Sequence, residues 1–455
     1  MSDNNQQNTP APGAAPEPAA ASASASAPAS ASAPASSPAP QPAAAPAPKP
    51  DTEAPRSNKI LNEILGGSFL ISILAVLLAL IAGAILIAAT NEDVQTASGY
   101  FFSRPGDTLG AIWQAVSGAY SALFQGSVYN FRRDSFADGI KPLTETLTFA
   151  TPLIAAGLGV GLAFRVGLFN IGGRGQMLIA AACAGWVGFS FQLPAPLHIT
   201  LAVLAGIAGG AIWGGLVGFL KARTGAHEVI LTIMLNYVAF YLISYMLRTP
   251  GLLQAPGSPN PKSPPMAETA VFPALFGSKY NLHLGFILVI VATALVWYLL
   301  NRSSLGFRFR AVGENPNAAK VAGIDVKNTY VYAMLFSGGL VGLAGVSQVL
   351  GTVTGGFSGG IDAGIGFDAI TVALLGRSKP IGIFFAGILF GAFKAGGFSM
   401  QAAEGVPVDI VVVVQSLIVL FIAAPPLVRA IFFLPKPGGR ARRVLPNVSK
   451  EVAAK

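Results

Sequence analysis

The chain has 455 residues, of which 53% are hydrophobic and 11% are charged, and its formal net charge at pH 7 is +9. Soluble domains carry about 25% charged residues, so this composition excludes an ordinary soluble protein and indicates a polytopic membrane protein. The basic balance does not indicate nucleic acid as a partner, because the Lys and Arg residues cluster in short segments between apolar spans. The single Cys183 and three scattered histidines support neither a disulfide framework nor a metal site.

The first 57 residues are almost entirely Ala, Pro and Ser, and 13 of the 33 prolines precede Arg56. Such a composition cannot bury a core, so we expect a disordered cytoplasmic tail over residues 1–57. It lacks the basic-then-apolar start of a secretory signal peptide. We expect a transmembrane domain over residues 58–434 to follow, and then a basic cytoplasmic tail over residues 435–455.

Ten apolar segments predict an all-α protein that crosses the membrane many times. The first, residues 66–89, has 24 residues without a charge, which is enough to cross about 30 Å of hydrocarbon. Residues 108–124 have helical spacing of apolar residues but are interpreted as an interfacial or packed outer-side helix. The remaining segments are predicted at residues 146–164, 176–193, 198–220, 229–247, 283–300, 329–350, 367–375, 381–397 and 408–424.

The segment at 367–375 is too short to cross a membrane alone. Its glycine-rich lead-in, residues 355–366, must be buried in protein or line a cavity, because lipid cannot satisfy an irregular backbone. For the orientation, an N-terminus in the cytoplasm puts 21 of the 29 Lys and Arg residues on the inner side. The positive-inside rule therefore predicts that both termini are cytoplasmic.

A long polar segment, residues 305–328, separates two apolar spans in the second half of the chain. Asn315 is a good N-cap, Pro316 suits the first helical position, and Gly323 can end the helix. A basic cytoplasmic loop that holds a short helix of small residues could dock a soluble partner. The alternative is an ordinary solvated loop.

Polar or glycine-rich stretches interrupt the apolar pattern at three further places. In residues 164–176, FRVGLFNIGGRGQ, an apolar span breaks and then resumes. Such a break is typical of a helix interrupted at a transport pathway, and the alternative is a tight glycine-rich turn between two helices. At the start of the span at 229–247, Glu228 could cap the helix, and Asn236 could line a pore or bond to another helix. In residues 355–380, Asp362 and Asp368 flank a glycine-rich bend that fits a pathway lining or close helix packing.

These motifs together resemble a known family. FNIGGRGQMLIAA at 169–181 is similar to the FNIG-x-x-GQ motif of bacterial ABC importer permeases in the branched-chain amino acid, sugar and nucleoside superfamily. GAHEVILTIMLNY, GENPNAAKVAGID and GIGFDAITVALLGRSKPIGI follow in the same order and spacing, and the resemblance covers residues 142–424. It is greatest to the nucleoside and simple-sugar branch. His227, where the family usually has Asn, and Gly173-Arg174, where an acidic residue is common, depart from the pattern.

The resemblance implies a permease subunit in the plasma (inner) membrane that forms the translocation pathway for a small solute, a nucleoside or a simple sugar. The implied partners are a second homologous permease subunit, a cytoplasmic ATPase and an extracytoplasmic solute-binding protein. The chain has no G-x-x-x-x-G-K-[ST] stretch, so ATP hydrolysis is expected on the separate ATPase and no cofactor on this chain. The 305–328 loop would hold the coupling helix that docks on the ATPase.

The candidate residues follow from the same motifs. For the translocation path, they are Asn170, Gln176, Asn236, Asp362 and Asp368. For coupling to the ATPase, they are Gly313, Glu314, Asn315, Pro316, Ala319 and Gly323. A secondary transporter driven by H⁺ or Na⁺ is the main alternative, and it would use carboxylates deep in the spans. A membrane-embedded enzyme or scaffold is a further alternative, but no paired carboxylates and no Ser–His or His–Glu arrangement support catalysis.

Overall fold

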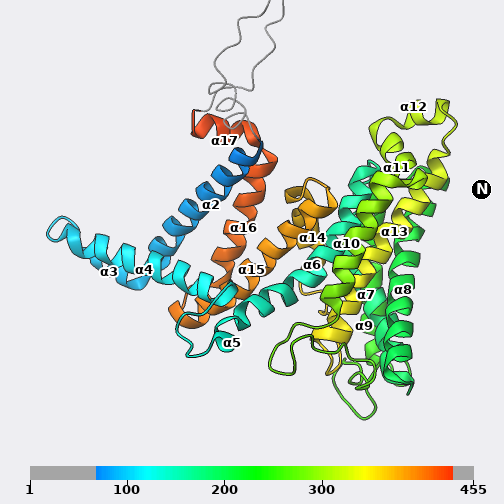
Figure 1. Ribbon diagram of the computed structural model, residues 1–455, viewed down its shortest axis with the longest axis horizontal. Coiled ribbons are helices and arrows are strands. Elements are labelled where there is room, and N and C mark those ends of the chain that lie inside the picture. Colours follow the sequence, from blue (N-terminus) through cyan, green and yellow to red (C-terminus); the bar gives the residue numbers. More distant parts are fainter. Residues whose placement is uncertain (1–67, 434–455) are drawn as a thin grey trace, which may run out of the picture. The chain divides into compact units, whose positions relative to one another are not determined.

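A computed structural model describes residues 68–433 of the chain (Figure 1). The predicted tails at 1–57 and 435–455, and with them the predicted cytoplasmic placement of both termini, lie outside the described residues. Within 68–433 the regular structure is helical, and the only bridge between extended residues joins Ala274 and His283. The all-α class is therefore confirmed.

The helices follow the predicted segments closely. Their bounds are α2 Ser68–Thr90, α3 Glu92–Ser98, α4 Pro105–Ser127, α5 Phe136–Gly139, α6 Lys141–Arg165, α7 Gly173–Ser190, α8 Ala195–Thr224, α9 Glu228–Arg248, α10 Gly285–Arg302, α11 Ser304–Glu314, α12 Pro316–Val321, α13 Val326–Ser347, a π-helical turn η1 Gln348–Thr352, α14 Ile365–Leu375, α15 Pro380–Glu404, α16 Val408–Ala423 and α17 Pro425–Ile431. The predicted helix at 108–124 is thus real, as α4.

The long apolar helices alone account for fewer than the ten predicted membrane segments. Seven helices of the described part are long and apolar enough to cross a membrane, or eight if the bent pair α16 and α17 forms one span. The segment predicted at 176–193 is α7, whose first turn, Gly-Arg-Gly-Gln, lowers its mean hydropathy. The segment predicted at 367–375 is α14, an apolar helix of 11 residues. Most of α7 is buried by protein, including Gly173, Gly175 and Gln176 of its first turn.

Helix α6 lies at the centre of the packing. An unbroken run of its residues, from Ala150 to Ala163, is buried, and the helix contacts α10, α13, α14 and α15. A second apolar cluster joins α2, α4, α15 and α16, and a third joins α7, α8, α9 and the loop before α10. Helix α15 belongs to the second cluster, and α13 contributes Val346 to the third. Because α6 contacts both helices, it connects these clusters.

Glycines allow the backbones of α8 and α13 to touch. A Cβ atom on Gly210 would lie 2.5 Å from the carbonyl oxygen of Gly338, and one on Gly214 would lie 2.5 Å from that of Met334. Such small-residue contacts are typical of helix pairs in membranes, where backbone approach replaces hydrophobic burial as a source of packing energy.

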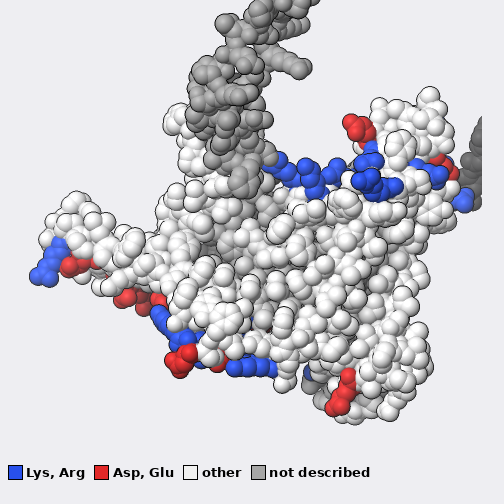
Figure 2. All heavy atoms as spheres, viewed as in Figure 1, with Lys and Arg blue, Asp and Glu red and all other residues white. Residues whose placement is uncertain are grey.

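On the face drawn in Figure 2, charged side chains gather at two ends of the molecule. Figure 2 shows an uncharged belt between two ends, one of which carries a row of Lys and Arg close to α11 and α12. The opposite end carries a mixture of acidic and basic side chains. An uncharged belt bounded by charged ends is what burial in a bilayer requires.

Candidate translocation and coupling sites

The break between α6 and α7 is held by a buried network of amide side chains. Asn170 is completely buried, and its Nδ2 donates hydrogen bonds to Ser337 Oγ at 2.8 Å and Gln176 Oε1 at 3.1 Å. Its Oδ1 accepts from the backbone N–H of Gly172 at 2.9 Å. Ser337 in turn donates to the carbonyl of Gly159 on α6. Two of the predicted path residues, Asn170 and Gln176, are therefore brought together and are hydrogen-bonded to protein.

Asn236 of α9 clamps the same break from the other side. Its Nδ2 donates to the carbonyl oxygen of Ile171 at 2.9 Å, and its Oδ1 accepts from the N–H of Gly175 at 2.8 Å. The residue is 6% exposed. Of the two roles considered for Asn236, the hydrogen bond between segments is the one that this geometry contains. Its place on a solute path stays a prediction.

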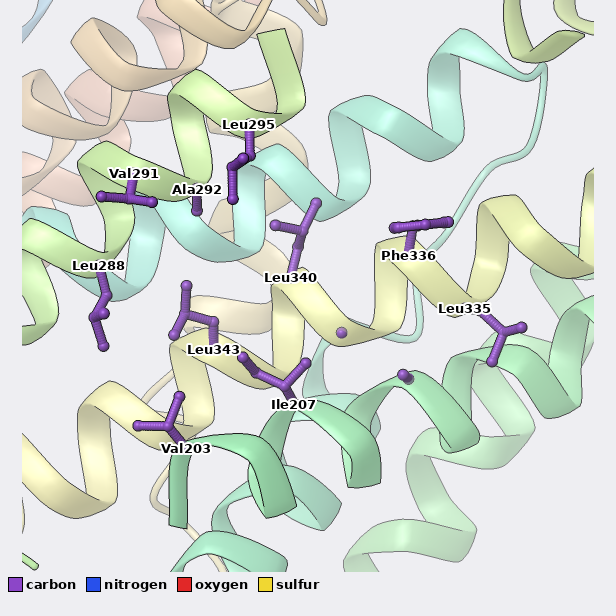
Figure 3. A pocket seen from close by; sticks show the side chains of 12 residues that line it. Val203, Ile207, Leu288, Val291, Ala292, Leu295, Leu335, Phe336, Leu340 and Leu343 are labelled. Carbon is purple, nitrogen blue, oxygen red and sulfur yellow. The ribbon is translucent and has the colours of Figure 1, made fainter. Parts of the chain in front are cut away.

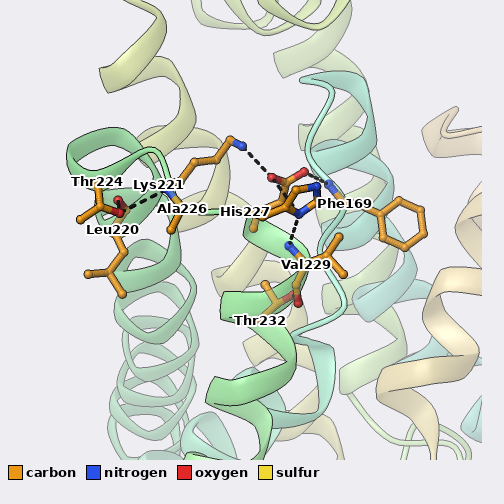
Figure 4. A network of polar contacts seen from close by, with 9 residues as sticks. Phe169, Leu220, Lys221, Thr224, Ala226, His227, Val229 and Thr232 are labelled. Carbon is orange, nitrogen blue, oxygen red and sulfur yellow. Dashed lines mark hydrogen bonds and ion pairs between the residues drawn. The ribbon is translucent and has the colours of Figure 1, made fainter.

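A charged side chain anchors the break at its N-terminal end (Figure 4). Glu228 accepts a hydrogen bond from Lys221 Nζ of α8 at 2.6 Å and a longer one from the N–H of Phe169 at 3.4 Å. The N-cap of α9 is His227, whose Nδ1 accepts from the N–H of Val229. The expectation that Glu228 caps the helix is wrong, because His227 is the cap even though it departs from the family pattern. Glu228 instead joins α8, α9 and the break.

The glycine-rich lead-in to α14 packs directly on the start of α7. Asp362, 5% exposed, forms an ion pair with Arg174 Nε at 3.3 Å, and the Arg174 guanidinium lies 4.7 Å from the ring centroid of Phe240. A Cβ atom on Gly366 would lie 2.4 Å from the backbone nitrogen of Arg174. Arg174, one of the departures from the family pattern, thus supplies the partner of a predicted path residue.

Asp368 has a different environment, because it lines a cavity. Its Oδ2 lies 2.8 Å from Lys394 Nζ of α15. The cavity has a volume of about 370 Å³ and is lined by residues of α6, η1, α14, α15 and α16. Asp368 is the one predicted path residue that faces this space. The lead-in to α14 was expected to be buried in protein or to line a cavity, and its residues Ala363 and Gly364 belong to this lining.

The sequence interpretation missed the other polar groups of this cavity, Lys394, Gln348 and Gln415. A signal for Lys394 was present, because a charged residue in the middle of an apolar span is expensive and marks a functional candidate. Gln348 and Gln415 give no comparable signal in the sequence, because amides also occur as ordinary links between helices.

A second cavity, of about 540 Å³, lies between α8, α10 and α13 and is lined entirely by apolar residues and one glycine (Figure 3). Leu288, Leu295 and Leu343 point into it from two of these helices. A polar solute would lose its hydrogen bonds to water there without replacement. Among the two cavities, only the one beside Asp368 suits a polar solute.

The predicted coupling segment forms a helix pair, α11 and α12. Asn315 caps α12, and its Oδ1 accepts from the N–H groups of Asn317 at 3.0 Å and Ala318 at 3.1 Å. At the other end Gly323 has φ +82°, and the N–H of Ile324 donates to the carbonyl of Ala319, as in a Schellman motif. The predicted start and stop of this short helix are confirmed.

The six predicted coupling residues differ in exposure. Glu314, Asn315, Pro316 and Gly323 are exposed, Gly313 is half-buried, and Ala319 is 4% exposed. Ala319 packs in the core of this chain, so its side chain does not offer a contact surface to a partner. Val321 was not predicted, yet it is 91% exposed on the same helix.

Gly313 links the coupling segment to the break. A Cβ atom on Gly313 would lie 2.2 Å from the carbonyl oxygen of Arg165, the last residue of α6. Displacement of α11 would therefore press directly on the residues that lead into the break.

No group of three or more His, Cys, Asp or Glu residues within 68–433 could hold a metal ion.

Comparison with known proteins identifies a family and several relatives that cover most of the chain. The family model described as branched-chain amino acid transport system / permease component matches residues 143–423. The guanosine ABC transporter permease protein NupP of Bacillus subtilis is 35% identical over 79% of this chain and 94% of its own length. The nucleoside ABC transporter permease protein NupB of Lactococcus lactis subsp. cremoris is 36% identical over 65% of this chain and 82% of its own.

A sugar permease is similarly related. The glucose ABC transporter permease protein TsgB13 of Haloferax volcanii is 35% identical over 62% of this chain and 75% of its own length. No solved structure matches the chain.

Proposed function

The chain belongs to the branched-chain amino acid transport system / permease component family, and from that premise we propose that it imports a nucleoside. It is a multi-pass membrane protein and a permease subunit of an ABC transporter, not an enzyme, and ATP is hydrolysed on a separate subunit. The match to a guanosine permease over 94% of that protein's length carries the choice of a nucleoside. A simple sugar is the second candidate, because a glucose permease is almost equally similar.

The family match does not support the ion-coupled alternative. Asp368, one of the carboxylates that this alternative would use, is also paired with Lys394 at 2.8 Å.

The complete arrangement in the membrane is also a proposal. We take α16 and α17 as one bent span, which gives eight apolar spans, and α7 and α14 as two further embedded segments, so that the total is the ten predicted, with both termini in the cytoplasm. The row of Lys and Arg beside α11 and α12 supports this orientation, because such residues favour the cytoplasmic side (Figure 2). The chain would then consist of the transmembrane domain at 58–434 between two cytoplasmic tails.

For the mechanism, we propose that α11 and α12, within the loop at 305–328, dock on the cytoplasmic ATPase. A second permease subunit would complete the pathway, and an extracytoplasmic binding protein would deliver the solute. Movement of the ATPase would displace α11, and the contact between Gly313 and Arg165 would pass that displacement to the break between α6 and α7. The ATPase would thereby favour one of two states of the pathway.

The test is uptake of labelled guanosine and labelled glucose by cells that carry the whole operon. A matched strain would carry the ATPase with its P-loop lysine replaced. Guanosine uptake that disappears in the matched strain supports the proposal. Uptake of glucose alone would favour the second candidate. Uptake that persists without ATP hydrolysis and collapses with an ionophore would refute an ATP-driven importer.

A further inference from the structure

The cavity beside Asp368 combines features that packing alone does not explain. It lies where five elements meet, α6, η1, α14, α15 and α16, and its volume of about 370 Å³ is within the range of small-molecule sites, about 300–1,000 Å³. One of its walls, η1, is a π-helical turn, a rare form that is frequent at functional sites. Another wall contains Ala363 at φ +44°, an unfavourable backbone conformation for a residue with a Cβ atom.

Gln348 supplies a hydrogen-bonding group without a partner. The residue opens η1, is 7% exposed and lines the cavity. Its Oε1 is buried and accepts no hydrogen bond from the described part of the chain. Burial of a carbonyl without a donor is unfavourable, so a ligand N–H or O–H at this point would be stabilised.

The charged groups of the cavity form a pair. Asp368 and Lys394 are 33% and 24% exposed at their side chains and lie 2.8 Å apart, and the other lining residues are uncharged. The charges of this pair cancel, so the lining does not select an anion such as a phosphorylated solute. The carboxylate of such a pair can still accept a hydrogen bond from one hydroxyl of a neutral solute, while the ammonium group donates one to a neighbouring hydroxyl.

Aromatic rings complete the lining. The rings of Phe149 on α6 and Phe398 on α15 have centroids 5.8 Å apart and an interplanar angle of 31°. Aromatic side chains stack on nucleobases irrespective of the base, because every base has a π-face. An amide such as that of Gln348 can also pair with the hydrogen-bonding edge of a base.

We propose that this cavity is a nucleoside-binding site on the translocation path of this chain. Gln348 binds the edge of the base, the phenylalanine rings contact its face, and the pair Asp368 and Lys394 binds the ribose hydroxyls. Gln415, 6% exposed, adds a second amide to the lining. The inference rests on the proposed nucleoside import and extends it, because it assigns recognition of the solute to the permease itself.

The test uses the whole transporter in cells and labelled guanosine as the probe. Gln348→Ala and Asp368→Asn are compared with Gln401→Ala, which changes an exposed glutamine of α15 outside the cavity. We expect the initial rate of uptake to fall about tenfold in the first two variants, as for one lost hydrogen bond in the transition state, and to be unchanged in the third. The amount of each variant in the membrane is measured in parallel, so that loss of the protein is not read as loss of binding.

A second measurement keeps the test valid if a variant folds poorly. Cys183→Ser removes the only native thiol, and Gln348→Cys then places one in the cavity. Excess guanosine should slow its reaction with N-ethylmaleimide, whereas glucose should not. Unchanged uptake by Gln348→Ala together with unprotected Cys labelling would refute the site while leaving nucleoside import intact. Absence of guanosine uptake by the wild-type transporter would refute both.

Discussion

Replacing Asn236 by alanine separates the two roles that its sequence context allows. The alanine would remove one acceptor, used by the N–H of Gly175, and one donor, used by the carbonyl of Ile171. Since Asn236 is 6% exposed, water cannot readily replace it. An orphaned buried polar group costs about 1–3 kcal/mol, and hydrogen bonds between membrane helices lie towards the lower end of such values. We therefore expect Asn236→Ala to destabilise the protein by about 2–4 kcal/mol.

The assay is thermal unfolding of the detergent-purified protein, followed by the loss of monodisperse protein on heating. Asn301→Ala is the matched control, because Asn301 is an exposed asparagine that bonds only to the carbonyl of Trp297 in its own helix. We expect a melting temperature lowered by several degrees for Asn236→Ala and nearly unchanged for Asn301→Ala. A wild-type melting temperature together with lost uptake would refute the clamp and favour direct contact with the solute.

Three further changes test the coupling segment and one loop contact. In Gly313→Val, the new side chain would clash with the carbonyl oxygen of Arg165, since even a Cβ atom at residue 313 would lie 2.2 Å from that oxygen. We expect uptake to be at least tenfold slower while the ATPase subunit stays bound. Uptake at the wild-type rate would contradict the proposed link. Val321→Glu changes a side chain that is 91% exposed. We expect less ATPase to co-purify with this variant, while its melting temperature stays unchanged. Full co-purification would exclude this face of α12 as the docking surface. The hydrogen bond from Lys279 at 2.5 Å lowers the pKa of Asp138. The contact therefore contributes to folding stability at pH values above the ordinary aspartate pKa near 3.8, and this contribution is lost as the pH falls through the lowered pKa. We expect a small acid-dependent loss of thermal stability that Lys279→Gln abolishes, and an identical pH profile in that variant would show that the contact does not contribute.

The class and the element bounds were readable from the sequence, because they depend on local properties. A bilayer requires long apolar helices, and Asn315, Pro316 and Gly323 mark the ends of α12 through their own backbone preferences. The break after α6 was equally readable, because glycine and asparagine interrupt an apolar run there. The sequence also marked α14 as a membrane segment too short to cross alone, but how such a partly buried helix is covered depends on its neighbours.

The partners of each polar side chain were decided by the tertiary structure alone. Asn170, Asp362 and Asp368 are equally conspicuous in the sequence, yet the first holds a break, the second pairs with Arg174, and the third lines a cavity with Lys394. The burial of Ala319 and the exposure of Val321 likewise depend on how α12 lies against the core. Sequence determines which residues are costly to bury in a membrane. The packing of distant helices determines which of them are paired within the protein and which remain available to a solute.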